Sequence, residues 1–215
     1  MSYDLQEQEQ LDAFKAWWKA NNNWLTGAAT VLLVAALAYQ GWTWYGTRQA
    51  AKASTLYEEF ERTSSSKDPK DGAKAREVAG ALMDRYGSTL YASMAGLRAA
   101  RASIDAGDLK VAKEQLTWVA DHGAEKELAL LARVRLAGVL LDEKAYDQAL
   151  QALKVDVPEA FASEFADRRG DVLAAQGKLA EARAAYAEAL SKAGSQPLRT
   201  LIQMKLDALP ASGGA

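Results

Sequence analysis

Six arginines are the side chains of this sequence best suited to binding another molecule. They occur two at a time in three stretches that the sequence predicts to be helices: 94–105, 128–141 and 159–175. They are Arg98, Arg101, Arg133, Arg135, Arg168 and Arg169. A guanidinium group offers a fork of N–H donors that matches a carboxylate. A groove lined by these side chains would therefore suit acidic or carboxylate-bearing peptides. The alternative is that they are solvated and paired with neighbouring acids such as Asp105, Glu164 and Asp171.

The sequence contains few of the residues that catalysis usually requires. His122 is the only histidine, and the chain contains no cysteine. Transition-metal sites and thiol nucleophiles therefore lack their usual ligands and groups. The glycine-rich phosphate-binding motifs and the G-x-S-x-G nucleophile turn do not occur, and nothing points to a Ser–Lys dyad. We expect a protein that is not an enzyme and that binds no cofactor and no metal.

The composition predicts an all-α fold. Of the 215 residues, 49% are hydrophobic, and Ala dominates this half. Ala and Leu, with Glu, Lys, Arg and Gln, favour helices, whereas β-branched residues are few. The formal net charge of −2 leaves no basic surface of the kind that nucleic acids require, so we expect no nucleic-acid partner.

The elements that must carry the arginines form a repeat. Three turns correspond: Gly107-Asp108-Leu109, Lys144-Ala145-Tyr146 and Gly177-Lys178-Leu179. Alanines follow the turns at one offset, at spacings of 37 and 33 residues, with small residues twelve positions before them and large residues four positions after them. The alanines are Ala112, Ala149 and Ala182, the small residues are Ala100, Ala137 and Gly170, and the large residues are Leu116, Leu153 and Tyr186. Small residues let two helices approach closely, and each large residue fills the groove to the next pair.

This period is similar to that of the tetratricopeptide repeat, which is about 34 residues long. The third copy fits best, whereas Asp156 stands where a small residue is expected and the early Trp of the repeat is absent from all three copies. The resemblance implies a TPR-like α-solenoid of stacked helix pairs. The concave face of such a stack usually binds an extended peptide or a helix.

A charge-free stretch, Trp24 to Tyr45, precedes the repeats. Its 22 residues would form about 33 Å of helix, enough to cross a hydrocarbon core of roughly 30 Å. Its aromatic ends are typical of a membrane interface; the interfacial residues are Trp24, Trp42, Trp44 and Tyr45. The alternatives are a buried core helix or a signal peptide cleaved after Ala36-Leu37-Ala38. The long acidic segment before the stretch favours an uncleaved anchor in the lipid bilayer.

We therefore divide the chain into a cytoplasmic tail (1–23), a transmembrane helix (24–45), a TPR-like domain (46–209) and a disordered tail (210–215). Lys15 and Lys19 on one side balance Arg48 and Lys52 on the other, so charge leaves the orientation open. In the first tail, an apolar stripe could lie on the inner leaflet or dock a cytoplasmic partner. The alternative is a helix before the anchor whose aromatic residues have no binding role. The stripe consists of Leu11, Phe14, Trp17 and Trp18.

Two stretches near the carboxyl end carry a family resemblance: FADRRGDVLAAQGKLAEARAAYAEAL at 165–190 and LIQMKLDAL at 201–209. With the acidic tail, the anchor and a predicted Tyr45-Gly46 turn, they make the chain similar to the YfgM family of bacterial inner-membrane proteins. The resemblance implies an inner-membrane protein of type II topology, with its carboxyl-terminal domain in the periplasm. It also implies an ancillary subunit of the SecYEG translocon that works with a PpiD-like membrane-anchored chaperone on unfolded or nascent periplasmic and outer-membrane proteins. The alternative is a TPR scaffold of another envelope process, such as outer-membrane biogenesis or cell division.

Overall fold

The computed structural model describes residues 3–66 and 68–210, and the regular structure within these residues is helical throughout. The predicted all-α class is therefore confirmed. The chain divides into two compact units, Met1–Gln49 and Ala50–Ala215. The predicted tail at 210–215 lies outside the described residues, apart from Pro210.

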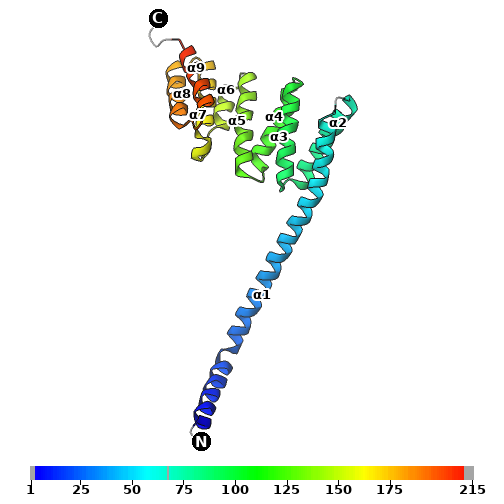
Figure 1. Ribbon diagram of the computed structural model, residues 1–215, viewed down its shortest axis with the longest axis vertical. Helices are drawn as coiled ribbons and strands as arrows, with labels where there is room; N and C mark the ends of the chain where they lie inside the picture. The colour runs from blue at the N-terminus through cyan, green and yellow to red at the C-terminus, as the bar shows by residue number, and fades with distance from the viewer. Residues whose placement is uncertain (1–2, 67, 211–215) are drawn as a thin grey trace. The chain divides into compact units, whose positions relative to one another are not determined.

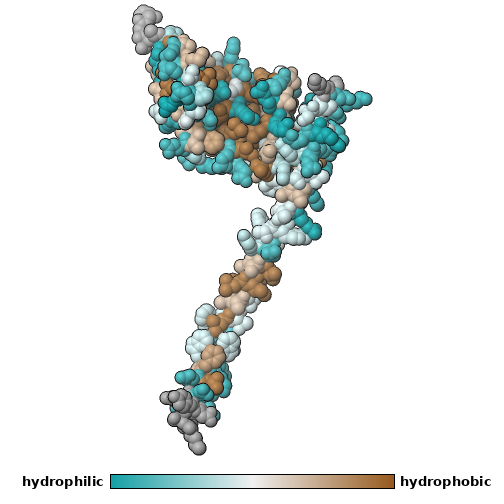
Figure 2. Space-filling model, viewed as in Figure 1, coloured by the Kyte–Doolittle hydropathy of each residue, from teal (hydrophilic) through white to brown (hydrophobic). Residues whose placement is uncertain are grey.

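The first unit is formed by helix α1, which runs from Tyr3 to Ser64 and enters the second unit at Ala50. Within the described residues, α1 is the one helix long and apolar enough to cross a membrane, and no part of its apolar window is buried in the protein. Figure 2 shows these hydrophobic side chains on the surface of the unit. A core helix would bury these side chains, so their exposure fits a helix surrounded by lipid.

The aromatic residues at the ends of the apolar stretch are exposed as well. Trp24 is 62% exposed and Trp42 is 82% exposed. The guanidinium of Arg48 lies 4.0 Å from the centre of the Trp44 ring, where a cation–π contact is favourable. In the preceding tail, Phe14 stacks near Trp17 and Trp18, with ring centres 6.2 and 6.4 Å away.

The predicted turn at Tyr45-Gly46 is wrong, because both residues lie inside α1. A single helical glycine costs only about 1 kcal/mol relative to alanine, and its neighbours favour or tolerate the helix. The hydroxyl of Thr47 donates a hydrogen bond to the carbonyl of Thr43 at 2.9 Å, which satisfies it within the helix. The tail, the apolar stretch and the first segment after it therefore belong to one helix.

The second unit consists of the end of α1 followed by eight shorter helices in the described residues. Figure 1 shows them side by side as successive pairs. The helices are α2 (Pro69–Tyr86), α3 (Leu90–Asp105), α4 (Leu109–His122), α5 (Lys126–Asp142), α6 (Tyr146–Ala152), α7 (Glu159–Ala175), α8 (Leu179–Lys192) and α9 (Gln196–Ala208). The three predicted repeats are the pairs α3–α4, α5–α6 and α7–α8, and α9 packs on α8.

The three aligned turns share one backbone conformation. Gly107, Lys144 and Gly177 have φ values of 77°, 59° and 76°. This left-handed region is the usual way to end a helix sharply, and glycine enters it without steric cost. The middle repeat places a lysine there instead. Its second helix is also the shortest of the three, seven residues against fourteen in α4 and α8.

The core runs through the stack between the helices of each pair and its neighbours. Small residues lie where the helices pack against each other. Ala100, Ala112, Ala137, Ala149 and Ala182 are all fully buried. Leu116 is fully buried, and Leu153 and Tyr186 are 8% and 3% exposed. Gly170 is buried against the ring of Tyr186. The small and large residues that define the repeat are therefore buried in all three copies, and in the third copy Gly170 and Tyr186 contact each other within one helix pair.

Candidate functional site

The six arginines do not meet in one groove. Arg98 and Arg101 lie on α3, where Arg98 pairs with Glu61 of α1 and Arg101 with Asp105 at 3.0 Å. Arg169 pairs with Glu188 of α8 at 2.5 Å. The remaining three lie on α5 and α7. The arginines on the first helices of the pairs therefore contact acids on different helices and do not line one common groove.

Arg133 turns toward α4, where its guanidinium donates to the carbonyl of Ala120 and to Asp121, both at 3.2 Å. Arg168 donates to Asp171 at 3.3 Å. Arg135 is exposed. Most of these charges are thus occupied by acids of the protein itself, and an acidic ligand would have to compete for them.

A first pocket is lined by Arg98, Arg101 and a third arginine, Arg76, which sequence analysis did not select. It has a volume of about 450 Å³ and lies between the end of α1, α2 and α3. Phe60, Ala75 and Ala99 form its buried apolar floor. Arg76 of α2 forms no ion pair with any described residue, while Asp105 and Asp108 add two acids to the lining. This pocket can hold an apolar side chain beside a negative charge.

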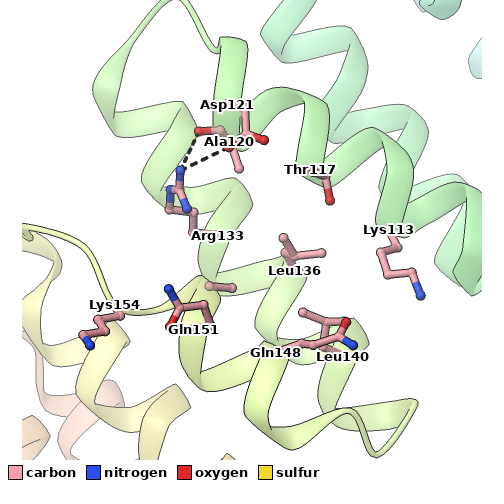
Figure 3. Close-up of a pocket in the computed structure, with 11 residues that line it drawn as sticks. Lys113, Thr117, Ala120, Asp121, Arg133, Leu136, Leu140, Gln148, Gln151 and Lys154 are labelled. Atoms are coloured by element: carbon pink, nitrogen blue, oxygen red, sulfur yellow. Dashed lines mark hydrogen bonds and ion pairs between the residues drawn. The ribbon is translucent and has the colours of Figure 1, made fainter.

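A second pocket, of about 370 Å³, lies between α4 and α6 and has α5 as its floor (Figure 3). Leu136 and Leu140 lie at its base and are 7% and 4% exposed. Its walls carry Thr117, Gln148 and Gln151. Sequence reasoning missed these residues, because they carry no charge and lie on the second helices of their pairs. Their position between two repeats is the only signal that could have found them.

Partly buried charges hold the last helices together. Lys205 of α9 lies 2.7 Å from Asp167 and 2.8 Å from Asp171, both on α7. The hydroxyl of Tyr186 donates to Asp171 at 2.8 Å. Burial raises the pKa of Asp167 although Lys205 opposes the change, and burial with the Asp171 hydrogen bond raises the pKa of Tyr186. The charged groups of this cluster pair with one another, which is typical of a structural role; we call this cluster the α7–α9 lock.

His122 is the last residue of α4, and its side chain contacts only its own helix in the interactions that follow. Its ring stacks on Trp118 with centres 5.3 Å apart, and its Nδ1 lies 3.0 Å from the carbonyl oxygen of Trp118. Across residues 3–66 and 68–210, no group of three or more His, Asp or Glu side chains could hold a metal ion. The two pockets are therefore the candidate functional sites, and both are suited to binding.

A helical anchor followed by stacked helix pairs with surface pockets defines a membrane-bound TPR-like interaction protein. The family model described as a tetratricopeptide repeat-like domain matches residues 15–211. A Neisseria gonorrhoeae protein named ancillary SecYEG translocon subunit is 37% identical over 97% of this chain and 100% of its own length. Proteins of the same name from Aggregatibacter actinomycetemcomitans and Escherichia coli are 28% and 26% identical, over 97% and 94% of this chain and 100% and 96% of theirs. The chain therefore belongs to the YfgM family of TPR-like proteins, as its carboxyl-terminal motifs indicated.

Proposed function

We propose that this protein is an ancillary subunit of the SecYEG translocon, anchored in the bacterial inner membrane by residues 24–45. The observation that carries the proposal is its 37% identity, over nearly the whole of both chains, to a protein of that name. Identity over the full length includes the anchor and the solenoid, the two parts that such a subunit needs. The role is one of binding, without catalysis.

In this proposal, residues 1–23 lie in the cytoplasm and the TPR-like domain, 46–209, lies in the periplasm. The domain holds a PpiD-type chaperone and newly translocated proteins beside the channel. The exposed apolar helix and its interfacial aromatic residues support the anchor. The orientation rests on the resemblance to the family.

We also propose a role for the arginines of the first pocket. Arg76 is free of acidic partners in the described residues, and Arg98 and Arg101 stand beside it over an apolar floor. An acidic segment of a partner, such as the chaperone, would gain ion pairs at this rim and bury an apolar side chain. Arg133, Arg135, Arg168 and Arg169 lie elsewhere and would not share that contact.

The test is co-purification. The tagged full-length protein would be extracted in mild detergent, and its partners identified by mass spectrometry. SecY, SecE, SecG and a PpiD-type chaperone are expected. Recovery of outer-membrane assembly or cell-division proteins, with neither SecYEG nor the chaperone, would contradict the proposal and favour a scaffold of another envelope process.

A further inference from the structure

The pocket between α4 and α6 presents hydrogen-bonding groups that the protein leaves unused. The side chains of Thr117, Gln148 and Gln151 are exposed, and none forms a hydrogen bond with another described residue. A hydroxyl and a carboxamide can each both donate and accept. The carboxamide also matches the peptide group, which offers one N–H and one C=O per residue.

The charges around the pocket are largely neutralised from within. Lys113 pairs with Glu143 at 2.6 Å. Arg133 pairs with Asp121 at 3.2 Å, as Figure 3 shows. Lys154 is the one lining cation that forms no ion pair with a described residue. A strongly charged ligand would find little complementary charge here, so the pocket favours an uncharged one.

The dimensions fit a short stretch of extended chain. The α4 wall runs from Lys113 to Asp121, which is about 12 Å at the helical rise of roughly 1.5 Å per residue. An extended chain covers this length in about four residues. Leu136 and Leu140 at the base would receive one apolar side chain. The opposite wall is shorter, because α6 contributes only Gln148 to Ala152 before it ends.

We propose that this pocket binds an extended, uncharged segment of unfolded polypeptide, chiefly through its backbone and with little dependence on sequence. Thr117, Gln148 and Gln151 pair with the peptide groups of the segment, and Leu136 and Leu140 contact one of its side chains. The inference rests on the proposed function, because a translocon accessory meets chains that have not yet folded. It assigns to such chains a site separate from the arginine-rimmed pocket.

The test is fluorescence anisotropy with full-length protein in detergent and a fluorescein-labelled octapeptide of Ala, Ser, Thr and Leu. A scrambled version should bind within about threefold of the first peptide. A version with alternate backbone nitrogens methylated loses N–H donors while keeping its side chains, and its Kd should rise at least about tenfold. Equal binding of the methylated peptide would overturn backbone recognition.

Two variants locate the site. Thr117→Trp fills the pocket from the α4 wall and should raise the Kd at least about tenfold, whereas the same change at Thr200, exposed on α9, should leave it unchanged. The double variant Gln148→Met with Gln151→Met keeps the length of the wall side chains but removes their hydrogen bonds, and should weaken binding as well. Circular dichroism identifies any variant that fails to fold. If folded Thr117→Trp protein binds as the Thr200→Trp control does, the site is refuted.

The same variants separate this inference from the proposed function. Thr117→Trp should still co-purify with SecYEG, because the pocket is assigned to clients. Co-purification together with unchanged peptide binding would overturn the pocket alone. If the wild-type protein binds the peptide, Thr117→Trp loses that binding, and neither protein associates with SecYEG, the pocket is upheld and the translocon role is overturned.

Discussion

The ring of Tyr186 on α8 lies against the backbone of Gly170 on α7, so closely that a Cβ atom at position 170 would stand 2.6 Å from two carbons of the ring. The Tyr186 hydroxyl is fixed at the same time by its hydrogen bond to Asp171. The ring therefore cannot retreat without breaking that bond. This contact sets the spacing of the third helix pair.

We predict that Gly170→Ala destabilises the protein. Overpacking of a filled core costs about 1–3 kcal/mol, which outweighs the roughly 1 kcal/mol that alanine contributes to a helix. The free energy of unfolding, measured with urea for the full chain in detergent, is the test. Gly138→Ala on α5 is the matched control, because its Cβ would meet only the Arg168 guanidinium at 3.6 Å, and it should stabilise slightly. Equal effects of the two changes would contradict this packing.

Lys144→Gly should stabilise the middle repeat. Lys144 holds a φ of 59°, a conformation that costs a side-chain-bearing residue about 1–2 kcal/mol. Glycine removes this cost but adds about 0.5–1 kcal/mol of backbone entropy, so a net gain of roughly 0.5–1 kcal/mol is expected. Lys178→Gly, at a φ of −81°, relieves no strain and should destabilise. A loss of stability in Lys144→Gly would show that the turn is unstrained.

Lys205→Met should release α9 from α7. Asp167 and Asp171 have side chains only 14% and 15% exposed. Removing their shared cation leaves Asp167 without its ion-pair partner and Asp171 with Arg168 alone. We expect a loss of about 2 kcal/mol, with faster hydrogen exchange in α9. Lys192→Met, whose pair with Glu188 is 38% and 41% exposed, should change stability by less than about 0.5 kcal/mol. Unchanged exchange in α9 would refute the lock.

The stability contributed by Asp167 should depend on pH. Its pKa is raised in the folded protein, chiefly by burial, so the folded state binds this proton more readily than the unfolded state. Its charge therefore costs stability at neutral pH, and that cost disappears as the pH falls through the raised pKa toward the ordinary value of 3.8. Relative to Asp167→Asn, the wild-type protein should gain stability over this interval in urea titrations at successive pH values. A constant difference between the two would contradict the shift.

The orientation can be tested by single-cysteine labelling, since the chain contains no cysteine of its own. In spheroplasts, a membrane-impermeant maleimide should label Gln203→Cys on α9 and should reach Gln8→Cys only after lysis. Both positions are exposed helical residues, so neither is protected by the fold. The reverse pattern would place the TPR-like domain in the cytoplasm.

The architecture was predictable because it depends on local patterns. Gly107, Lys144 and Gly177 were aligned from offsets alone, and all three share a left-handed backbone. The apolar stretch was predicted from its length and aromatic ends. The Tyr45-Gly46 turn was wrong because one glycine between good helix formers does not end a helix.

The binding sites were harder to predict because they depend on tertiary neighbours. Arg133 and Arg135 are two positions apart on α5, and Arg133 turns to Asp121 of α4 while Arg135 is exposed. The sequence predicts that arginines lie on one helix, but it does not predict which acid each will meet. Thr117 and Gln148 line the same pocket only because α4 and α6 both pack on α5.

The most direct test of the translocon role is photo-crosslinking in living cells from within the anchor. Leu33 is 62% exposed at the middle of the apolar stretch, and a photo-reactive amino acid there would report on the neighbours of α1 in the bilayer. The account predicts crosslinks to SecYEG that increase when a secretory protein is arrested in the channel. Crosslinks only to other envelope complexes, with none to SecYEG under arrest, would contradict it.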